Sequence, residues 1–462
     1  MKPRTPKRLN FPAAADFRDL ARLAIPVALV QVGLMAMGVV DTMIVGHLSA
    51  AALAGVAVGT VYVFALGSFG MGLLMAVEPI LSQAIGAGET ESVARAFQRG
   101  LVLSALLGVL GALAILPLDS VLRAFGQSEE LIAVGVRYSR VQMPSMMAFY
   151  LFFLMRQCLQ AQGQTRPIVI TIVIANAFNA VLAWSLVFGH FGAPALGVWG
   201  AGLATTLARW VNVVLLLGLA WRELRPLFGW KAEAFQWRPM WRLMGIGLPI
   251  AVQYQLEFGV FAAVALIMGR IGQVPMAAHQ IAINIASLTF MVPMGISSAG
   301  AVLVGRAVGA GDAPRARRAA IASMIAGVVF MAFSAIALGS IPRSLARAYT
   351  NDAAVIAMAA SLLPIAAVFQ VFDALQVVSI GVLRGVGDTR TPLIVNLLGY
   401  WVLALPLGLW LAFRAGQGPQ GLWWGLVAGL ATVGVVLATR VRIRLWRSLE
   451  RLRVEDDPAL QG

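Results

Sequence analysis

Two acidic residues lie deep inside apolar stretches in the second half of the chain. Glu257 lies in the middle of the apolar segment 245–269, and Asp373 lies inside a later one. A carboxylate at the centre of a bilayer costs at least about 2–3 kcal/mol on insertion scales, so it faces protein or a water-filled cavity. Two carboxylates in a low-dielectric cavity share a proton or a cation, or bind a cationic substrate instead. This pattern predicts an ion-coupling site with Glu257 and Asp373; the alternative is a buried structural pair.

Polar and aromatic side chains occur at helical spacing around these acids and in the apolar segment between them. Amide oxygens can ligate sodium transiently at Glu257 and Asp373, and aromatic faces can hold an organic cation. Polar side chains of this kind also hold membrane helices together, which is the alternative for each one. The residues for which we predict substrate binding are Gln253, Tyr254, Phe261, Gln280, Asn284, Phe369 and Gln376.

The first half of the chain offers a second candidate site. Asp41 and Asn179 both lie in apolar segments, and we predict that they take part in ion coupling. A permanent metal site is not expected, because the three histidines are scattered and Cys158 is the only cysteine. No phosphate-binding loop of the G-x-x-x-x-G-K-[ST] type occurs, so we expect no nucleotide or other cofactor.

The composition places the whole chain in a membrane. Of its 462 residues 60% are hydrophobic and 12% are charged, with a mean hydropathy of +0.84. A soluble protein of this size could not bury so much apolar surface. Twelve apolar runs predict an all-α membrane protein with twelve transmembrane helices, the fourth of them centred near Met147.

The two halves of the chain repeat one another. At an offset of 223 residues, Ile-Pro-Val-Ala at 25–28 falls on Leu-Pro-Ile-Ala at 248–251, and Gly-Ala-Gly-Glu at 86–89 falls on Gly-Ala-Gly-Asp at 309–312. Such repeats are typical of secondary transporters. We therefore predict two six-helix lobes related by a pseudo-twofold axis: residues 1–223, a cytoplasmic linker at 224–240, and residues 241–462 with a cytoplasmic tail.

The charge of +15 is distributed as a topology signal rather than as a nucleic-acid patch. If the N-terminus lies inside, most of the 35 Lys and Arg residues fall in inner segments. The positive-inside rule then predicts that both termini are cytoplasmic, with anionic membrane lipids as the counter-charge.

Three motifs resemble the multidrug and toxic compound extrusion (MATE) family, over roughly residues 20–445. They are Asp-Thr-Met-Ile-Val-Gly at 41–46, Ala-His-Gln-Ile-Ala-Ile-Asn at 278–284 and Leu-Arg-Gly-Val-Gly-Asp-Thr at 383–389. Glu257 and Asp373 resemble the acids of the NorM-type branch. The resemblance implies a V-shaped two-lobe fold and export of cationic, amphipathic compounds in exchange for sodium ions or protons. In the family, a second Asn or Asp commonly follows four residues after the asparagine that corresponds to Asn179. Here that residue is Ala183, which leaves the first-half site incomplete.

These observations together predict a multidrug antiporter of a bacterial inner membrane, acting as a monomer without a cofactor or nucleic acid. One alternative is a flippase for a lipid-linked saccharide, although its phosphates would favour an arginine-lined cavity. The other is an intramembrane enzyme that uses paired acids. We expect no enzyme, because no motif of the aspartyl-protease type flanks Asp41, Glu257 or Asp373.

Overall fold

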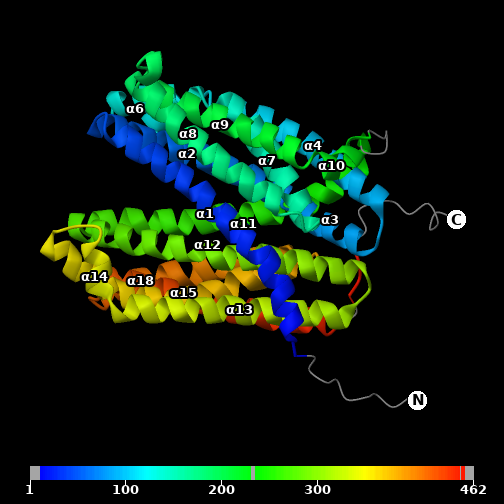
Figure 1. Ribbon diagram of the computed structural model, residues 1–462. Coiled ribbons are helices and arrows are strands. Elements are labelled where there is room, and N and C mark those ends of the chain that lie inside the picture. The colour runs from blue at the N-terminus through cyan, green and yellow to red at the C-terminus, as the bar shows by residue number, and fades with distance from the viewer. Residues whose placement is uncertain (1–10, 230–234, 448, 453–462) are drawn as a thin grey trace, which may run out of the picture. The chain divides into compact units, whose positions relative to one another are not determined.

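The computed structural model describes residues 11–229, 235–447 and 449–452, and every structural statement below refers to these residues. Within them all regular elements are helices, which confirms the predicted all-α class. Figure 1 shows long, roughly antiparallel helices joined by short connections. Among the described residues, eleven helical segments are long and apolar enough to cross a membrane, by length and composition.

In the first half of the chain, six longer helices correspond to the first six of the twelve predicted spans, and shorter helices lie between them. The elements are α1 (Ala14–Gly46), α2 (Ala50–Leu74), α3 (Val77–Gly86), α4 (Thr90–Leu113), α5 (Leu118–Ala124), α6 (Glu129–Arg140), α7 (Met143–Ala161), α8 (Arg166–Phe188), η1 (His190–Gly192), α9 (Val198–Leu219), α10 (Trp221–Leu224) and η2 (Arg225–Phe228).

The helices of the second half coincide with the other six predicted spans. The elements are α11 (Trp237–Ile271), α12 (Gln273–Gly309), α13 (Ala313–Ser340), α14 (Pro342–Arg347), α15 (Ala353–Gly385), α16 (Arg390–Asn396), η4 (Leu397–Ala404), α17 (Leu405–Leu409), η5 (Trp410–Arg414) and α18 (Pro419–Leu445). Both η4 and η5 are π-helical. They lie in the segment Arg390–Arg414, which counts as one span.

The fourth predicted span coincides with α7, which is not among the eleven segments. Arg156, Gln157 and Gln160 lower the mean hydropathy of α7, and all three side chains are buried. Polar side chains within the bilayer are expected to face protein rather than lipid. The fourth predicted span, α7, therefore stays a prediction, and its polar side chains face the protein interior.

Contacts divide the chain into two compact units that interleave along the sequence. Unit 1 comprises the chain up to Ala28, Ser82–Gly88 and Val260–Leu452, and unit 2 comprises Leu29–Leu81 and Glu89–Gly259. Helices α1 and α11 are thus each divided between the units. The predicted lobes, 1–223 and 241–462, follow the sequence repeat instead, and they stay a prediction.

Unit 1 is built on four helices that pack along their lengths. Helix α15 packs against α12, α13 and α18, and α12 also packs against α13. Without a hydrophobic driving force in lipid, membrane helices associate through close packing of small residues. Gly300 of α12 faces Ser323 of α13, and Gly385 of α15 faces the backbone of Ala301 of α12. These glycines let the helix backbones approach closely.

Unit 2 contains a second group of packed helices. Helix α7 packs against α4 and α9, α9 against α8, and α2 against α6. Gly59 of α2 lies against Ser139 of α6, and Gly100 of α4 lies against Leu154 of α7. Small residues therefore set the helix spacing here as well.

The sequence repeat reappears as equivalent close contacts, one in each unit. A β-carbon on Gly72 would lie 2.5 Å from Ala251 Cα in unit 2. A β-carbon on Gly295 would lie 2.8 Å from the backbone nitrogen of Ala28 in unit 1. Gly72 and Gly295 correspond at the repeat offset, and so do Ala28 and Ala251. The first part of α1 thus packs on α12 in the same way as the first part of α11 packs on α2.

A reciprocal glycine contact joins α3 to α12 within unit 1. A β-carbon on Gly86 would overlap the carbonyl of Arg306, and one on Gly309 would overlap the carbonyl of Gln83. At the repeat offset Gln83 corresponds to Arg306 and Gly86 to Gly309, so each partner of one contact has its equivalent in the other. A residue can approach the backbone of another helix this closely only where it lacks a β-carbon, as glycine does. We refer to this contact as the glycine crossing.

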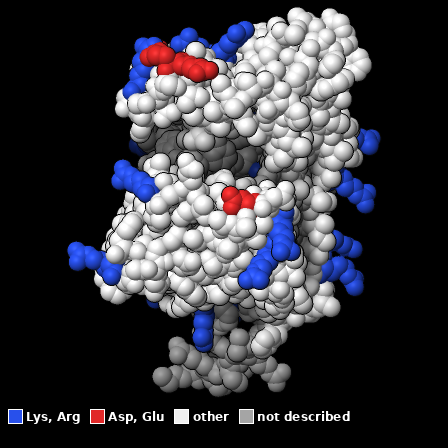
Figure 2. Space-filling view, turned by 90° about the vertical axis from the view of Figure 1, so that its left-hand side faces the viewer, with Lys and Arg blue, Asp and Glu red and all other residues white. Residues whose placement is uncertain are grey.

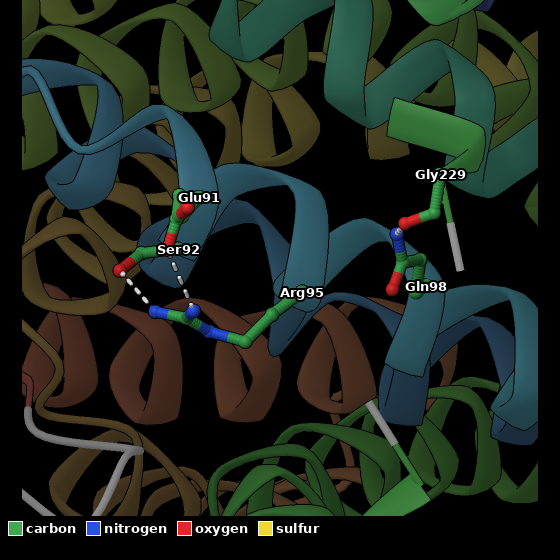
Figure 3. A network of polar contacts seen from close by, with 5 residues as sticks. All are labelled: Glu91, Ser92, Arg95, Gln98 and Gly229. Carbon is green, nitrogen blue, oxygen red and sulfur yellow. Dashed lines mark hydrogen bonds and ion pairs between the residues drawn. The ribbon is translucent and has the colours of Figure 1, made fainter. Parts of the chain in front are cut away.

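The first part of the predicted linker is docked on α4 in unit 2. The Gln98 side-chain amide donates hydrogen bonds to the carbonyls of Leu227, at 2.9 Å, and Gly229, at 2.7 Å. Figure 3 shows the Gln98–Gly229 bond, and beside it Arg95 bonded to Ser92 and Glu91 on the same helix. Buried Gln98 thus holds the docked residues by their backbone.

The surface agrees with a membrane environment. Figure 2 views the ends of the helices on the side where α6 and α14 lie, and charged side chains occur there in small groups. Many large apolar side chains of the long helices are exposed, including Phe64, Leu110, Val173, Leu266 and Phe333. These side chains are suited to lipid rather than water.

Candidate functional site

The acidic site of unit 2 is centred on Asp41 of α1, which is 5% exposed. The hydroxyl of Thr205, on α9, donates a hydrogen bond to Asp41 Oδ2 at 2.8 Å. Asp41 Oδ1 is buried without a hydrogen-bond partner among the described residues. The carboxylate therefore keeps one oxygen open to a proton or another cation.

Asn179 of α8 lies beside this carboxylate. Its side chain is fully buried, and within the described part of the chain neither amide atom has a hydrogen-bond partner. Ala183, one turn later on α8, is also fully buried and supplies no oxygen. The structure therefore brings the predicted residues Asp41 and Asn179 together, next to an apolar neighbour at Ala183.

Arg209 of α9 completes this cluster. Its guanidinium donates a hydrogen bond to Ser145 Oγ of α7 at 2.8 Å and lies 5.3 Å from the ring centre of Phe149. Its charge acts on Asp41. Sequence analysis did not assign Thr205 or Arg209 to the site, although their spacing of four residues inside an apolar segment could have indicated it.

Asp373 marks the acidic site of unit 1. It lies in the middle of α15 and is 8% exposed. One turn earlier, Gln370 donates a hydrogen bond to Thr289 Oγ1 at 2.6 Å and accepts one from Ser334 at 2.9 Å. These bonds connect α15 to α12 and α13, so the helix that carries Asp373 is held by polar contacts on the neighbouring turn.

Gln376, one turn after Asp373, is also buried and hydrogen-bonded. Its Oε1 accepts a bond from the Tyr400 hydroxyl at 2.7 Å, and its amide donates to Asn396 Oδ1 at 3.3 Å. Tyr400 lies in the π-helical segment η4. The network gives Gln376 structural partners on neighbouring segments, and its role in substrate binding stays a prediction.

Aromatic side chains form a wall in the same unit. The ring centre of Phe369 lies 6.1 Å from that of Phe261 and 5.7 Å from that of Trp423. Phe261 also lies 6.2 Å from Tyr400. Phe369, Tyr400 and Trp423 are almost completely buried, whereas Phe261 is half-buried. Only Phe261 of these four therefore has an accessible ring in this conformation.

The remaining predicted residues of the first part of α11 belong to unit 2. Gln253 is buried, and Tyr254 and Glu257 are half-buried. The neighbouring Gln255 donates hydrogen bonds to the carbonyl of Ala65 and to Ser68 on α2, at 2.7 and 3.0 Å. Glu257 and Asp373 lie in different units, so their action as a pair stays a prediction.

Helix α12 carries the predicted residues Gln280 and Asn284. Gln280 is exposed and Asn284 is half-buried. The Asn284 amide donates a hydrogen bond to the carbonyl of Gln280 at 2.9 Å. Both side chains are accessible to a ligand, as a substrate-binding role requires.

A second polar cluster in unit 2 surrounds Arg156 of α7. Its guanidinium donates a hydrogen bond to Gln31 Oε1 at 3.0 Å and lies 4.8 Å from the ring centre of Phe153. Buried Glu78 and half-buried Tyr254 act on it electrostatically. Sequence analysis assigned no site role to Arg156, which balances the charge of Glu78.

Comparison with known proteins gives consistent matches along the chain. The MatE family profile matches residues 26–185 and 249–410, and the two matches begin at positions that correspond in the sequence repeat. The chain is 38% identical over 432 residues to "Multidrug resistance protein NorM" of Burkholderia vietnamiensis, covering 92% of this chain and 94% of that protein. It is 37% identical over 440 residues to "Probable multidrug resistance protein NorM" of Burkholderia pseudomallei, covering 91% and 92%.

The fold is also shared with solved structures. One is described as the outward-facing conformation of a multidrug resistance MATE family transporter of the MOP superfamily. It is similar over 95% of this chain and 97% of that one, with a TM-score of 0.85 at 19% sequence identity. At this identity the similarity concerns the fold alone.

Proposed function

The chain belongs to the MatE family, and from this premise we propose that it exports cationic, amphipathic compounds in exchange for sodium ions or protons. The observation that carries the proposal is the burial of acidic side chains in helices apolar enough to cross a membrane. Asp41 and Asp373 are 5% and 8% exposed. Intramembrane acids are rare and typically mark ion or substrate pathways. The relatives' name, multidrug resistance protein, supports drugs as the substrates.

Exchange follows from competition for negative charge. A buried carboxylate without a counter-charge is unfavourable, so it is neutralised by a proton, a sodium ion or a cationic substrate. If the site binds only one of these cations at a time, entry of the coupling cation displaces the drug. Linkage requires that the drug lowers the affinity for the coupling cation by the same factor. We assign this role to Glu257 and Asp373, with Asp41 and Asn179 as a second site.

We propose that substrate binding in unit 1 begins at the accessible residues Phe261, Gln280 and Asn284, and that Tyr254 of unit 2, which is half-buried, also takes part in substrate binding. Aromatic faces attract organic cations, and amide groups orient them. Phe369 and Gln376 are buried in this conformation. They contact a substrate only in a conformation in which the aromatic wall opens. Gln253 of unit 2 is buried too, and we propose that it contacts a substrate only in another conformation of that unit.

Buried Arg156 and half-buried Arg209 do not favour the flippase alternative. Phosphate binding requires unpaired positive charge, but the charge of Arg156 is balanced by Glu78 and that of Arg209 by Asp41. We therefore propose a transporter for cations. We also propose that it acts as a monomer in a bacterial inner membrane, with anionic lipids around its basic inner segments.

Transport by purified protein in liposomes tests the function. A sodium gradient and a proton gradient are imposed in separate experiments. We expect one of them to drive ethidium against its own concentration gradient, and that gradient identifies the coupling cation. Liposomes without protein and with dissipated gradients are the controls. Transport that depends on neither gradient, or equal transport of a strongly anionic dye, would contradict the proposal.

A further inference from the structure

The inference concerns Arg209 and its position relative to Asp41 in unit 2. Arg209 lies one helical turn after Thr205 on α9, and side chains four residues apart share a helix face. Thr205 donates a hydrogen bond to Asp41. The same face of α9 therefore presents both a neutral donor and a permanent positive charge to the Asp41 site.

The guanidinium is bonded to side chains other than the carboxylate. It donates to Ser145 Oγ at 2.8 Å and lies over the ring of Phe149 at 5.3 Å, and both residues belong to α7. The other ionisable groups facing the cluster are Tyr138 of α6, which faces Asp41 and Arg209, and Tyr150 of α7, which faces Arg209. Arg209 is thus the only basic group acting on Asp41 among the described residues.

This arrangement balances charge without occupying the carboxylate. Asp41 Oδ1 is buried and has no hydrogen-bond partner among the residues that the structure describes. One neutral hydrogen bond cannot offset the cost of burying an ionised carboxylate, but a nearby guanidinium, which stays protonated, offsets part of it. Because the guanidinium is bonded elsewhere, Oδ1 stays open to an incoming cation.

We propose that Arg209, held by Ser145 and Phe149, is the resident counter-cation of Asp41 and keeps this carboxylate ionised and open between transport cycles. Removing the positive charge should leave Asp41 protonated for more of the time. Removing the bond to Ser145 should let the guanidinium move onto Oδ1 and close the site. The two changes therefore shift the state of Asp41 in opposite directions. The inference rests on the proposed role of Asp41 as a cation site.

Labelling with dicyclohexylcarbodiimide measures the protonated fraction of a carboxyl group in an apolar site. The acid proton moves to a carbodiimide nitrogen while the carboxylate oxygen bonds to the central carbon, and rearrangement leaves an N-acylurea. The peptide that contains Asp41 then gains the mass of one reagent molecule. Labelling would be followed by peptide mass spectrometry on the purified full-length protein at neutral pH, with Asp41→Asn as the unlabelled reference.

We expect Arg209→Gln to label Asp41 about tenfold faster than the wild type, because removing the positive charge that acts on Asp41 raises its protonated fraction, and a tenfold change corresponds to about 1.4 kcal/mol. Arg209→Lys keeps the charge and should label like the wild type, which separates loss of charge from loss of packing. Ser145→Ala should label more slowly than the wild type. Each variant is compared only after it elutes as a monodisperse protein.

Arg156→Gln is the matched control, because Arg156 also donates a hydrogen bond to a neutral side chain and lies over a phenylalanine on α7. It faces Glu78 rather than Asp41, so Asp41 should label as in the wild type. Unchanged labelling in Arg209→Gln, or equal increases in Arg209→Gln and Arg156→Gln, would overturn the inference. Faster labelling in Ser145→Ala would overturn the role of the Ser145 bond. None of these readouts depends on transport, so they remain informative if the proposed function fails.

Discussion

At the scale of single residues, the surroundings of the buried acid differ between the two units. In unit 2, Asp41 has one hydroxyl donor and a nearby guanidinium. In unit 1, the turns on either side of Asp373 are held by Gln370 and Gln376, whose amides bond to neighbouring helices. At the repeat offset Asp41 corresponds to Val264, so this acid is not duplicated. The positions of the buried acids therefore differ between halves that share equivalent packing contacts.

The acids of the second half provide the sharpest residue-scale prediction. Glu257→Gln keeps the shape of the side chain and removes the charge, so we expect efflux to fall to background while the protein stays folded. Asp373→Asn should do the same. If the two act as a unit, the double variant should be little worse than either single one. Asp41→Asn should have a milder effect, because Ala183 leaves its site incomplete. The measurement is gradient-driven efflux by purified variants in liposomes.

Folding of each variant is checked by its thermal unfolding midpoint. A midpoint at or above that of the wild type together with lost efflux would identify a functional carboxylate. Efflux at the wild-type rate by Glu257→Gln would show that this carboxylate is structural.

At the scale of elements, glycine sets the contacts that the repeat duplicates. Gly88 and Gly311 have φ of +76° and +70°, and Gly163 and Gly387 have +76° and +83°. These left-handed residues end the helices before them at equivalent places in the two halves, in a conformation that favours glycine. The turns explain why the Gly-Ala-Gly motif occurs twice in the sequence.

The glycine crossing gives the element-scale prediction. Gly86→Ala and Gly309→Ala each place a β-carbon against a backbone carbonyl, so α3 and α12 must separate. We expect each variant to lose about 1–3 kcal/mol of stability in this conformation, as overpacked sites do. The measurement is the thermal unfolding midpoint in detergent.

Gly339→Ala is the control for the crossing. Gly339 lies on α13 in the same unit, and a β-carbon there would meet nothing within 4 Å. It should unfold at or slightly above the wild-type midpoint, because alanine favours helix over glycine. If all three variants behaved alike, close approach of the backbones would not be what requires glycine at the crossing.

At the scale of the whole molecule, charge distribution predicts the orientation. Most Lys and Arg residues fall in segments that lie on one side if the chain crosses the membrane twelve times. We expect tags fused to either terminus to be protected from a membrane-impermeant reagent in intact cells and accessible in inverted vesicles. A tag in the loop between α14 and α15 should behave oppositely. Protection of one terminus but not the other would rule out an even number of spans, and α7 is the span in question.

The all-α class, the positions of the spans and the repeat could be predicted from the sequence alone. The reason is physical: lipid acts on every span in the same way, so length and apolar composition decide which segments can cross. The acids were recognisable for the same reason. Placing the carboxylates of Asp41, Glu257 and Asp373 within the membrane costs free energy whichever way their side chains are oriented. The motifs at 41–46, 278–284 and 383–389 indicated the family.

The partners of the acidic side chains were decided only by the tertiary structure. Thr205, Asn179 and Arg209 lie beside Asp41 on helices far from α1 in the chain, and no local pattern specifies such a contact. The same holds for Gln376, which could equally have faced a ligand but bonds to Tyr400 and Asn396. Hydropathy specifies that a polar side chain must find a partner inside the protein. Which partner it finds depends on the packing of whole helices, where glycines such as Gly86 and Gly309 allow their backbones to meet.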